Sequence, residues 1–210
     1  MILYVSFEIK VFMNQKLISD IKSYVNYLLL PLDKLYYHHY DHALSVMERA
    51  LYLGKEEGVS EDELEMLAIA ALFHDTWFVI QYDENEYIGA KIARNYLMTV
   101  LYNIEKISVI ESIILATSPS AIPYNLLEKI IKDADMDNLG TNEFFNISEK
   151  IKHEREIIQH IKIQDPDWHH ASLDLIEWHT FYTNTQIRER NEKLRENTEM
   201  LRKEVKKKKL

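Results

Sequence analysis

The spacing of apolar residues along the chain predicts a protein built from helices. Apolar side chains recur three and four residues apart through most of the 210 residues, which places them on one face of successive helices. Between residues 36 and 58 this spacing is carried by Ala43, Val46, Met47, Ala50 and Leu51. Ser60 to Glu63 then has the pattern of a capping box, so another helix is expected to begin there and to end near His74-Asp75.

Turn residues separate the helical segments and indicate about seven to nine helices. Helices are expected over residues 15–30, 36–58, 60–75, 86–100, 104–116, 125–139 and 141–160, and from 165 to the chain end, with a break near 182–184 as an alternative. Only four glycines and four prolines are present, which argues against a turn-rich β fold. The expected fold class is therefore all-α, a single-domain helical bundle with a long C-terminal helix.

The two ends of the chain differ in pattern from its middle. Apolar and polar residues alternate from Leu3 to Met13 as in a strand, so residues 1–14 are expected to be an N-terminal extension, which could lie upstream of the natural start. Residues 15–182 are assigned to the helical domain, and 183–210 to a charged C-terminal helix or tail. Along that tail Ile187, Leu194 and Leu201 lie seven residues apart, a weak coiled-coil pattern that leaves a homodimer open.

Composition limits the chemistry and the partners. The chain has no cysteine, which excludes disulfides and thiolate zinc sites and fits a cytoplasmic protein. The net charge is −9, although the segment from Gln186 to Leu210 has ten basic residues against five acidic ones. An acidic body does not favour nucleic-acid binding, and the basic segment is expected to be a solvated helix end rather than a nucleic-acid-binding arm. The apolar run from Tyr27 to Leu32 is far shorter than the ~20 residues of a membrane-spanning helix, so no membrane partner is expected.

A histidine and an aspartate, His74-Asp75, stand together at the end of the most apolar predicted helix. A carboxylate in such a place is costly to remove from water unless it is paired or bound to a metal. Asp135, between Ala134 and Met136 on another amphipathic helix, poses the same problem. A divalent ion held by His42, His74, Asp75 and Asp135 would satisfy all four residues, whereas the alternative is four unrelated buried polar side chains. Two nitrogens and two carboxylates suit one ion of Mn, Mg, Fe, Ni or Zn.

This set, in this order, resembles the signature of the HD-domain metal-dependent phosphohydrolase superfamily. That signature is a first His, then His-Asp, then a later Asp, and the resemblance covers about residues 36–160. It implies a helical bundle in which a metal-activated water hydrolyses a phosphoester. Dinuclear members carry extra histidines before the last Asp, but none lies between Thr76 and Ala134 here. The resemblance therefore implies a single ion and disfavours the di-iron oxygenase branch.

Finer similarities suggest further site residues. Tyr37-His38 before His42-Ala43 is similar to the opening motif of helical cyclic-nucleotide phosphodiesterases, which implies that His38 is a general acid, with His39 as an alternative that contacts substrate. Asn85-Glu86 and Arg155-Glu156 are similar to a subgroup of small predicted HD phosphohydrolases. By that resemblance Glu86 orients water or ligand and Arg155 binds phosphate. For His38 the alternative is a solvated residue at the start of a helix. For Glu86 it is a first-turn acid stabilised by the helix dipole, and for Arg155 a surface ion pair with a neighbouring glutamate.

The expected function is hydrolysis of a small phosphoester, with nucleotides as the favoured substrate class. Asp75 is expected to receive the proton of the attacking water, and Lys132 is either a phosphate contact or an ordinary surface lysine. The alternative function is a catalytically weak HD module that binds a nucleotide or acts as a regulatory or interaction protein.

Overall fold

The computed structural model describes residues 13–32, 37–76 and 86–207 of the chain. Within these ranges it contains nine α-helices and no strand, which confirms the predicted all-α fold class. The alternating segment at the N-terminus lies, except for Met13, outside the described residues. None of the helices in these ranges combines the length and the apolar character needed to cross a bilayer.

The observed helices follow the predicted segments closely, and the alternative break before residue 184 is present. They are α1 (Gln15–Leu29), α2 (Tyr40–Glu56), α3 (Glu61–Phe73), α4 (Glu86–Thr99), α5 (Ile104–Leu115), α6 (Leu126–Asp135), α7 (Phe144–Gln159), α8 (Asp165–Trp178) and α9 (Asn184–Lys207), with the short 3₁₀ helices η1 (Leu30–Leu32) and η3 (Asp137–Gly140). The predicted helix over 125–139 is instead divided into α6 and η3, because the backbone leaves the helical conformation at Met136. Asp135 therefore stands at the end of a helix.

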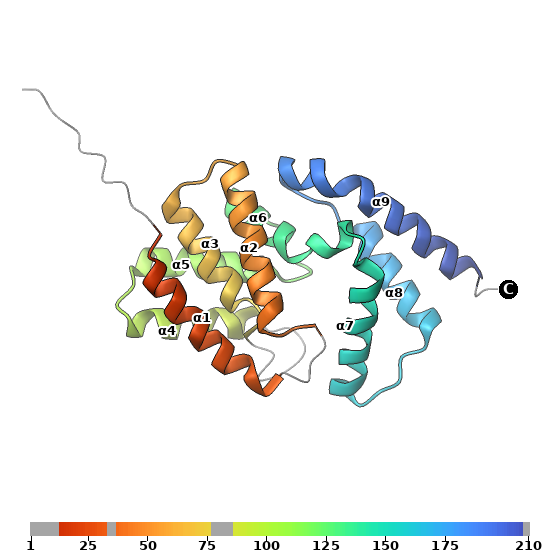
Figure 1. Ribbon diagram of the computed structural model, residues 1–210, viewed down its shortest axis with the longest axis horizontal. Helices are drawn as coiled ribbons and strands as arrows, with labels where there is room; N and C mark the ends of the chain where they lie inside the picture. The colour runs from red at the N-terminus through yellow and green to blue at the C-terminus, as the bar shows by residue number, and fades with distance from the viewer. Residues whose placement is uncertain (1–12, 33–36, 77–85, 208–210) are drawn as a thin grey trace, which may run out of the picture.

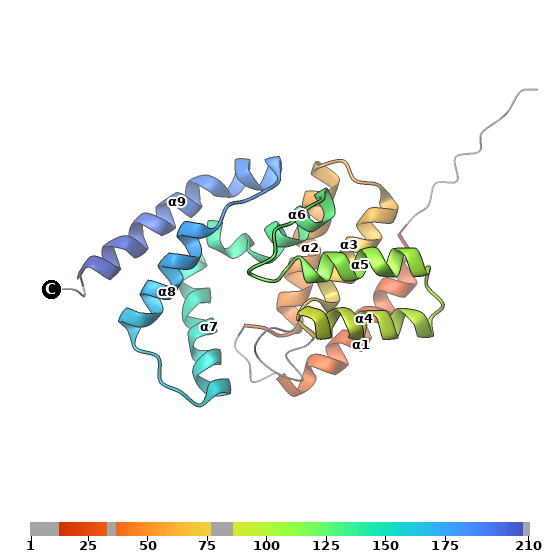
Figure 2. The same ribbon diagram turned by 180° about the vertical axis from the view of Figure 1, so that it is seen from behind.

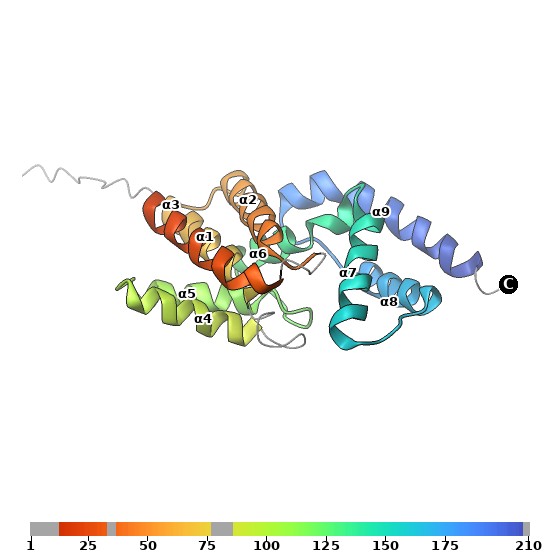
Figure 3. The ribbon, with the colours of Figure 1, turned by 60° about the horizontal axis from the view of Figure 1, so that its bottom comes forward.

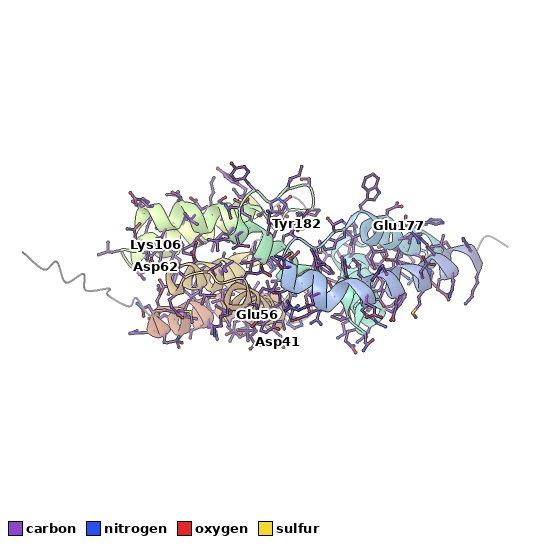
Figure 4. The ribbon with its side chains drawn as sticks, turned by 90° about the horizontal axis from the view of Figure 1, so that it is seen from above. Asp41, Glu56, Asp62, Lys106, Glu177 and Tyr182 are labelled. Atoms are coloured by element: carbon purple, nitrogen blue, oxygen red, sulfur yellow. The ribbon has the colours of Figure 1, made fainter. Side chains whose placement is uncertain are left out.

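Helices α1 to α6 form one half of the molecule around α3 (Figures 1 and 2). The Ser60–Glu63 capping box is formed as predicted and begins α3. Every residue from Leu64 to Phe73 is buried, as expected for a helix that is apolar on all sides. Helices α1, α2, α4, α5 and α6 all pack against it, with α4 and α5 side by side (Figure 3). An ion pair of 2.6 Å between Asp62 and Lys106 joins α3 to α5 at the surface (Figure 4).

The other half contains α7, α8 and α9, which enclose a second apolar core. Its buried members come from η3, from these three helices and from the segment before α9: Leu139, Phe144, Ile176, Phe181, Leu194 and Leu201. The linker from α8 to α9, where Figure 4 labels Tyr182, is fixed to the end of α6. The Asp133 carboxylate accepts hydrogen bonds from the backbone N–H groups of Tyr182 at 2.9 Å and Thr183 at 2.7 Å. These bonds hold the start of α9 against the first half.

Most of the charged C-terminal segment, assigned to 183–210 as a helix or tail, forms helix α9, and this helix packs against the rest of the described chain. Leu201 is 1% exposed, and the Asn197 amide donates to the carbonyls of Leu139 and Thr141 at 2.9 and 2.8 Å. Gly140 permits this contact, because a Cβ there would lie 2.6 Å from the Cβ of Arg190. Its role is to allow the close approach of η3 and α9.

Leu201→Ala should therefore destabilise the protein by about 2–5 kcal/mol, since it opens a cavity in the second core. Met200→Ala is the matched control, because Met200 on the same helix is 48% exposed and should change stability by less than about 0.5 kcal/mol. Urea unfolding followed by circular dichroism measures both. Equal, small effects of the two variants would mean that α9 does not pack against the protein.

Candidate metal centre and pocket

Four side chains that are distant in sequence converge between the ends of three helices. His42 lies in the first turn of α2, His74 caps the C-terminus of α3 with Asp75 next, and Asp135 ends α6. Asp75 Oδ2 is 3.3 Å from His42 Nε2 and 3.0 Å from His74 Nε2. Asp135 Oδ1 is 3.3 and 3.4 Å from the same two nitrogens.

Local hydrogen bonds explain why the helices begin and end at these points. His39 is the N-cap of α2, and its Nδ1 accepts the backbone N–H of Asp41 at 3.1 Å. At the end of α3 the Thr76 hydroxyl donates to the Phe73 carbonyl at 2.8 Å. His74 Nδ1 lies 2.7 Å from the Ala71 carbonyl oxygen, which can only accept, so this nitrogen carries the ring proton. The lone pair of neutral His74 is therefore on Nε2, which faces the two carboxylates.

The polar atoms at the centre of this cluster lack the hydrogen bonds that burial normally requires. Among the described residues, no hydrogen-bond partner is found for the buried Nε2 atoms of His42 and His74 or for Oδ2 of Asp75. Orphaned buried polar atoms are uncommon and call for an explanation, such as a bound ion. The ligand atoms of His42, His74 and Asp135 all lie within 4.8 Å of one another, a spacing that can hold a metal ion.

The electrostatics of the cluster also favour a cation at its centre. Burial alone would lower the pKa of His74, but the Asp75 and Asp135 carboxylates outweigh it and raise this pKa well above its ordinary value. Burial would raise the pKa of Asp75, yet the His74 and His42 rings hold it well below its ordinary value. Both shifts show that positive charge is stabilised beside the carboxylates. Two imidazoles and two carboxylates fit a hard or borderline divalent ion.

A pocket of about 350 Å³ adjoins the cluster. Asp75 and Asp135 contribute to its wall, together with His38 and Glu86. Much of the remaining wall comes from apolar and aromatic side chains of η3, α7 and α8: Leu139, Phe144, Ile151, Trp168 and Leu175. The pocket thus lies where the two halves of the molecule meet, with the candidate metal ligands among its lining residues.

The other predicted site residues lie in three different places: at the pocket described above, at a second pocket, and away from both. His38, Glu86 and Arg155 line the pocket. Arg155 is exposed and donates to Gln159 at 3.3 Å, and the described residues offer it none of the ion pairs that were the alternative. His39 lines a second pocket of about 370 Å³, to which His42 and Asp135 also contribute.

Lys132 is neither a surface lysine nor available to a phosphate. It is 5% exposed, and its ammonium donates to the carbonyls of Ala116 at 3.3 Å, Ser118 at 2.6 Å and Ala121 at 2.8 Å. An ammonium has three donors, and all three are used. Lys132 therefore fixes the segment after α5 to α6, and we do not propose it as a substrate contact.

Two residues near this pocket, Glu154 and Trp168, were not among the site residues predicted from the sequence. Glu154 is buried and contacts His38, and Trp168 lines the wall and donates to Ser148 at 2.9 Å. Glu154 stands in a charged run that was interpreted as an exposed helix face. Its position, three residues after Ile151 and four before Ile158, was the signal available, since it places the carboxylate on the apolar face of α7.

Comparison with known families identifies the central part of the chain. Residues 39–139 match the sequence model of the HD domain. The chain carries an HD domain. This match runs from the N-cap of α2 to η3 and thus includes all four candidate ligands. No curated protein sequence matches the chain.

Solved structures resemble the whole fold and not the HD domain alone. Bacillus subtilis YpgQ in complex with ADP is 21% identical, with a TM-score of 0.61 over 90% of this chain and 95% of YpgQ. Listeria innocua Lin1889 is 22% identical, with a TM-score of 0.59 over 91% of this chain and 96% of Lin1889. A Lactobacillus plantarum protein is 16% identical, with a TM-score of 0.65 over 94% of this chain and 97% of its own. The shared fold therefore extends beyond residues 39–139.

Loss of one histidine should empty the HD-domain metal centre. Wild-type protein is expected to hold about one divalent ion per chain, and Mn²⁺ added after chelation should raise its thermal midpoint, because the ion binds only the folded state. His74→Gln should lose both properties, while His153→Gln, whose side chain is 55% exposed, should keep them. Elemental analysis and thermal unfolding measure these effects. Equal metal content in the two variants would show that the ion is bound elsewhere.

Proposed function

We propose that this HD-domain protein is a metal-dependent phosphohydrolase of a small phosphoester, with a nucleotide as the favoured substrate. The observation that carries the proposal is the cluster of His42, His74, Asp75 and the partly buried Asp135, in which buried atoms of the first three have no hydrogen-bond partner among the described residues, beside a pocket of about 350 Å³. A cluster of this donor chemistry beside a pocket of ligand size is typical of a catalytic site.

The metal ligands would be His42, His74, Asp75 and Asp135. A divalent ion bound there would polarise a phosphoryl oxygen and lower the pKa of a bound water. Asp75, which both holds the ion and lines the pocket, receives the proton of the attacking water. Glu86, at the first turn of α4 and on the same wall, orients that water or the ligand.

The remaining walls are suited to the two parts of a nucleotide. Arg155 contacts the phosphate, because its planar fork can donate two parallel hydrogen bonds and lies at the pocket without an ion-pair partner among the described residues. Trp168, Phe144 and Leu175 offer an apolar surface to the base. The likeness in fold to YpgQ, which was solved in complex with ADP, supports a nucleotide as the ligand class.

His38 is proposed to protonate the leaving oxygen. Its ring lines the pocket together with Asp75, and its centroid is 5.7 Å from that of His42. A proton donor beside the metal ligands allows an alkoxide to leave as an alcohol, which contributes about 10²–10⁴-fold to a rate.

Purified protein supplied with Mn²⁺, Ni²⁺ or Mg²⁺ should hydrolyse a generic phosphoester and at least one member of a nucleotide panel. Asp75→Asn should lower kcat by at least about 100-fold, because it weakens the metal centre and removes the proton acceptor. Asp20→Asn on α1 is the control and should retain full activity, since this exposed carboxylate pairs with surface Lys16 at 2.7 Å. Phosphate release and liquid chromatography of the products measure turnover. A metal-loaded protein that hydrolyses no member of the panel would overturn the proposal and favour a nucleotide-binding regulatory module.

A further inference from the structure

One fully buried carboxylate near the pocket, outside the candidate metal ligands, is Glu154 on α7. Its side chain is 0% exposed. Glu154 Oε2 accepts the backbone N–H groups of Tyr37 at 3.0 Å and His38 at 2.9 Å. Its other oxygen, Oε1, makes a short hydrogen bond with Nδ1 of the His38 ring. Both oxygens thus contact the short segment that precedes α2, which lies 116 residues earlier in the chain.

These contacts compensate the cost of removing a carboxylate from water. Removing a carboxylate from water is unfavourable unless hydrogen bonds or an opposite charge compensate it. Burial raises the pKa of Glu154, but the hydrogen bonds from His38 and from the backbone outweigh it and hold this pKa below its ordinary value. An ionised carboxylate only accepts hydrogen bonds, so His38 Nδ1 must be the donor. The contact therefore fixes which nitrogen of the ring carries the proton.

The same contact fixes the direction of the ring. Because Nδ1 is bound to Glu154, Nε2 is the ring nitrogen that is left to contact a ligand. His38 lines the pocket together with Asp75. The backbone bonds to Tyr37 and His38 hold the main chain as well as the side chain. An unrestrained histidine at the start of a helix would sample several rotamers, most of which point its nitrogen away from a substrate.

We propose that Glu154 is a positioning residue, which holds His38 so that Nε2 faces the leaving oxygen of the substrate. The proton donor is the imidazolium form of His38, which keeps Nδ1–H on Glu154, passes the proton on Nε2 to the leaving oxygen and is left as the neutral ring. This inference rests on the proposed function, because it assigns Glu154 to the proton-donating step of that reaction. It also explains why α7, outside the matched HD domain, must be docked before the site is complete. If Glu154 only held α7 against the segment before α2, its loss would change kcat by the same factor for every substrate, whatever the leaving group.

Glu154→Gln distinguishes these roles, since it keeps the shape of the side chain but has one acceptor oxygen where Glu154 has two. If that oxygen accepts the backbone N–H groups of Tyr37 and His38, the amide NH₂ meets Nδ1 and the ring loses its acceptor. For a nucleotide, whose leaving oxygen needs a proton, kcat should fall at least about tenfold while KM changes less than about threefold. For p-nitrophenyl phosphate, whose leaving group departs without a proton, kcat should stay near that of wild type. Glu149→Gln, at an exposed position of the same helix, is the control and should behave as wild type on both substrates.

A double variant tests whether Glu154 acts through His38. Adding Glu154→Gln to His38→Ala should cause no further loss of kcat. If the two residues acted independently, the losses of kcat of the two single variants would multiply. Nitrogen-15 NMR of the imidazoles in metal-free protein gives a readout that needs no turnover: His38 should be protonated at Nδ1 in wild type and lose that state in Glu154→Gln. Multiplicative losses, an equal loss on both substrates, or an unchanged His38 spectrum would overturn the positioning role. Wild-type protein that turns over neither substrate would instead contradict the proposed function, and the NMR result would then decide on Glu154 alone.

Discussion

The constraint on which the structure depends is the placement of two carboxylates, the buried Asp75 and the partly buried Asp135, beside two buried imidazoles. The free-energy cost of removing two carboxylates from water is large unless nearby positive charge compensates it. The ring protonation of His74, fixed by the Ala71 carbonyl, turns a nitrogen lone pair toward the same point. A divalent cation would satisfy all of these groups at once, and they meet at the start of α2 and at the ends of α3 and α6.

Further buried carboxylates connect the two halves of the molecule. Asp133 on α6 binds the linker before α9, and Glu154 on α7 binds the segment before α2. Each accepts backbone N–H groups from a segment distant in sequence, so each stabilises one relative placement of the halves. The pocket has walls from both halves and depends on that placement. Helix α9 belongs to the same arrangement, since its contact with Gly140 and Leu139 holds η3 beside Asp135.

Much of this arrangement could be predicted from the sequence. Helical periodicity and capping signals located the helices, and the improbable polarity of His74-Asp75 pointed to a cluster around His74 that could hold a metal. It could not be predicted which of the charged residues are buried. Lys132 and Glu154 stand in ordinary charged stretches, and only the tertiary fold brings carbonyls to one and backbone N–H groups to the other. The burial of α9 was missed for a related reason, because its apolar stripe is narrow and lies among many charges.

Anomalous diffraction of crystals grown with Mn²⁺ tests the metal centre most directly. We expect one strong peak per chain, in contact with His42, His74, Asp75 and Asp135 and adjoining the pocket lined by Arg155 and Trp168. A second ion of equal strength would contradict the single-metal site. A crystal with Mn²⁺ in the solvent but no peak at these residues would contradict the metal centre itself.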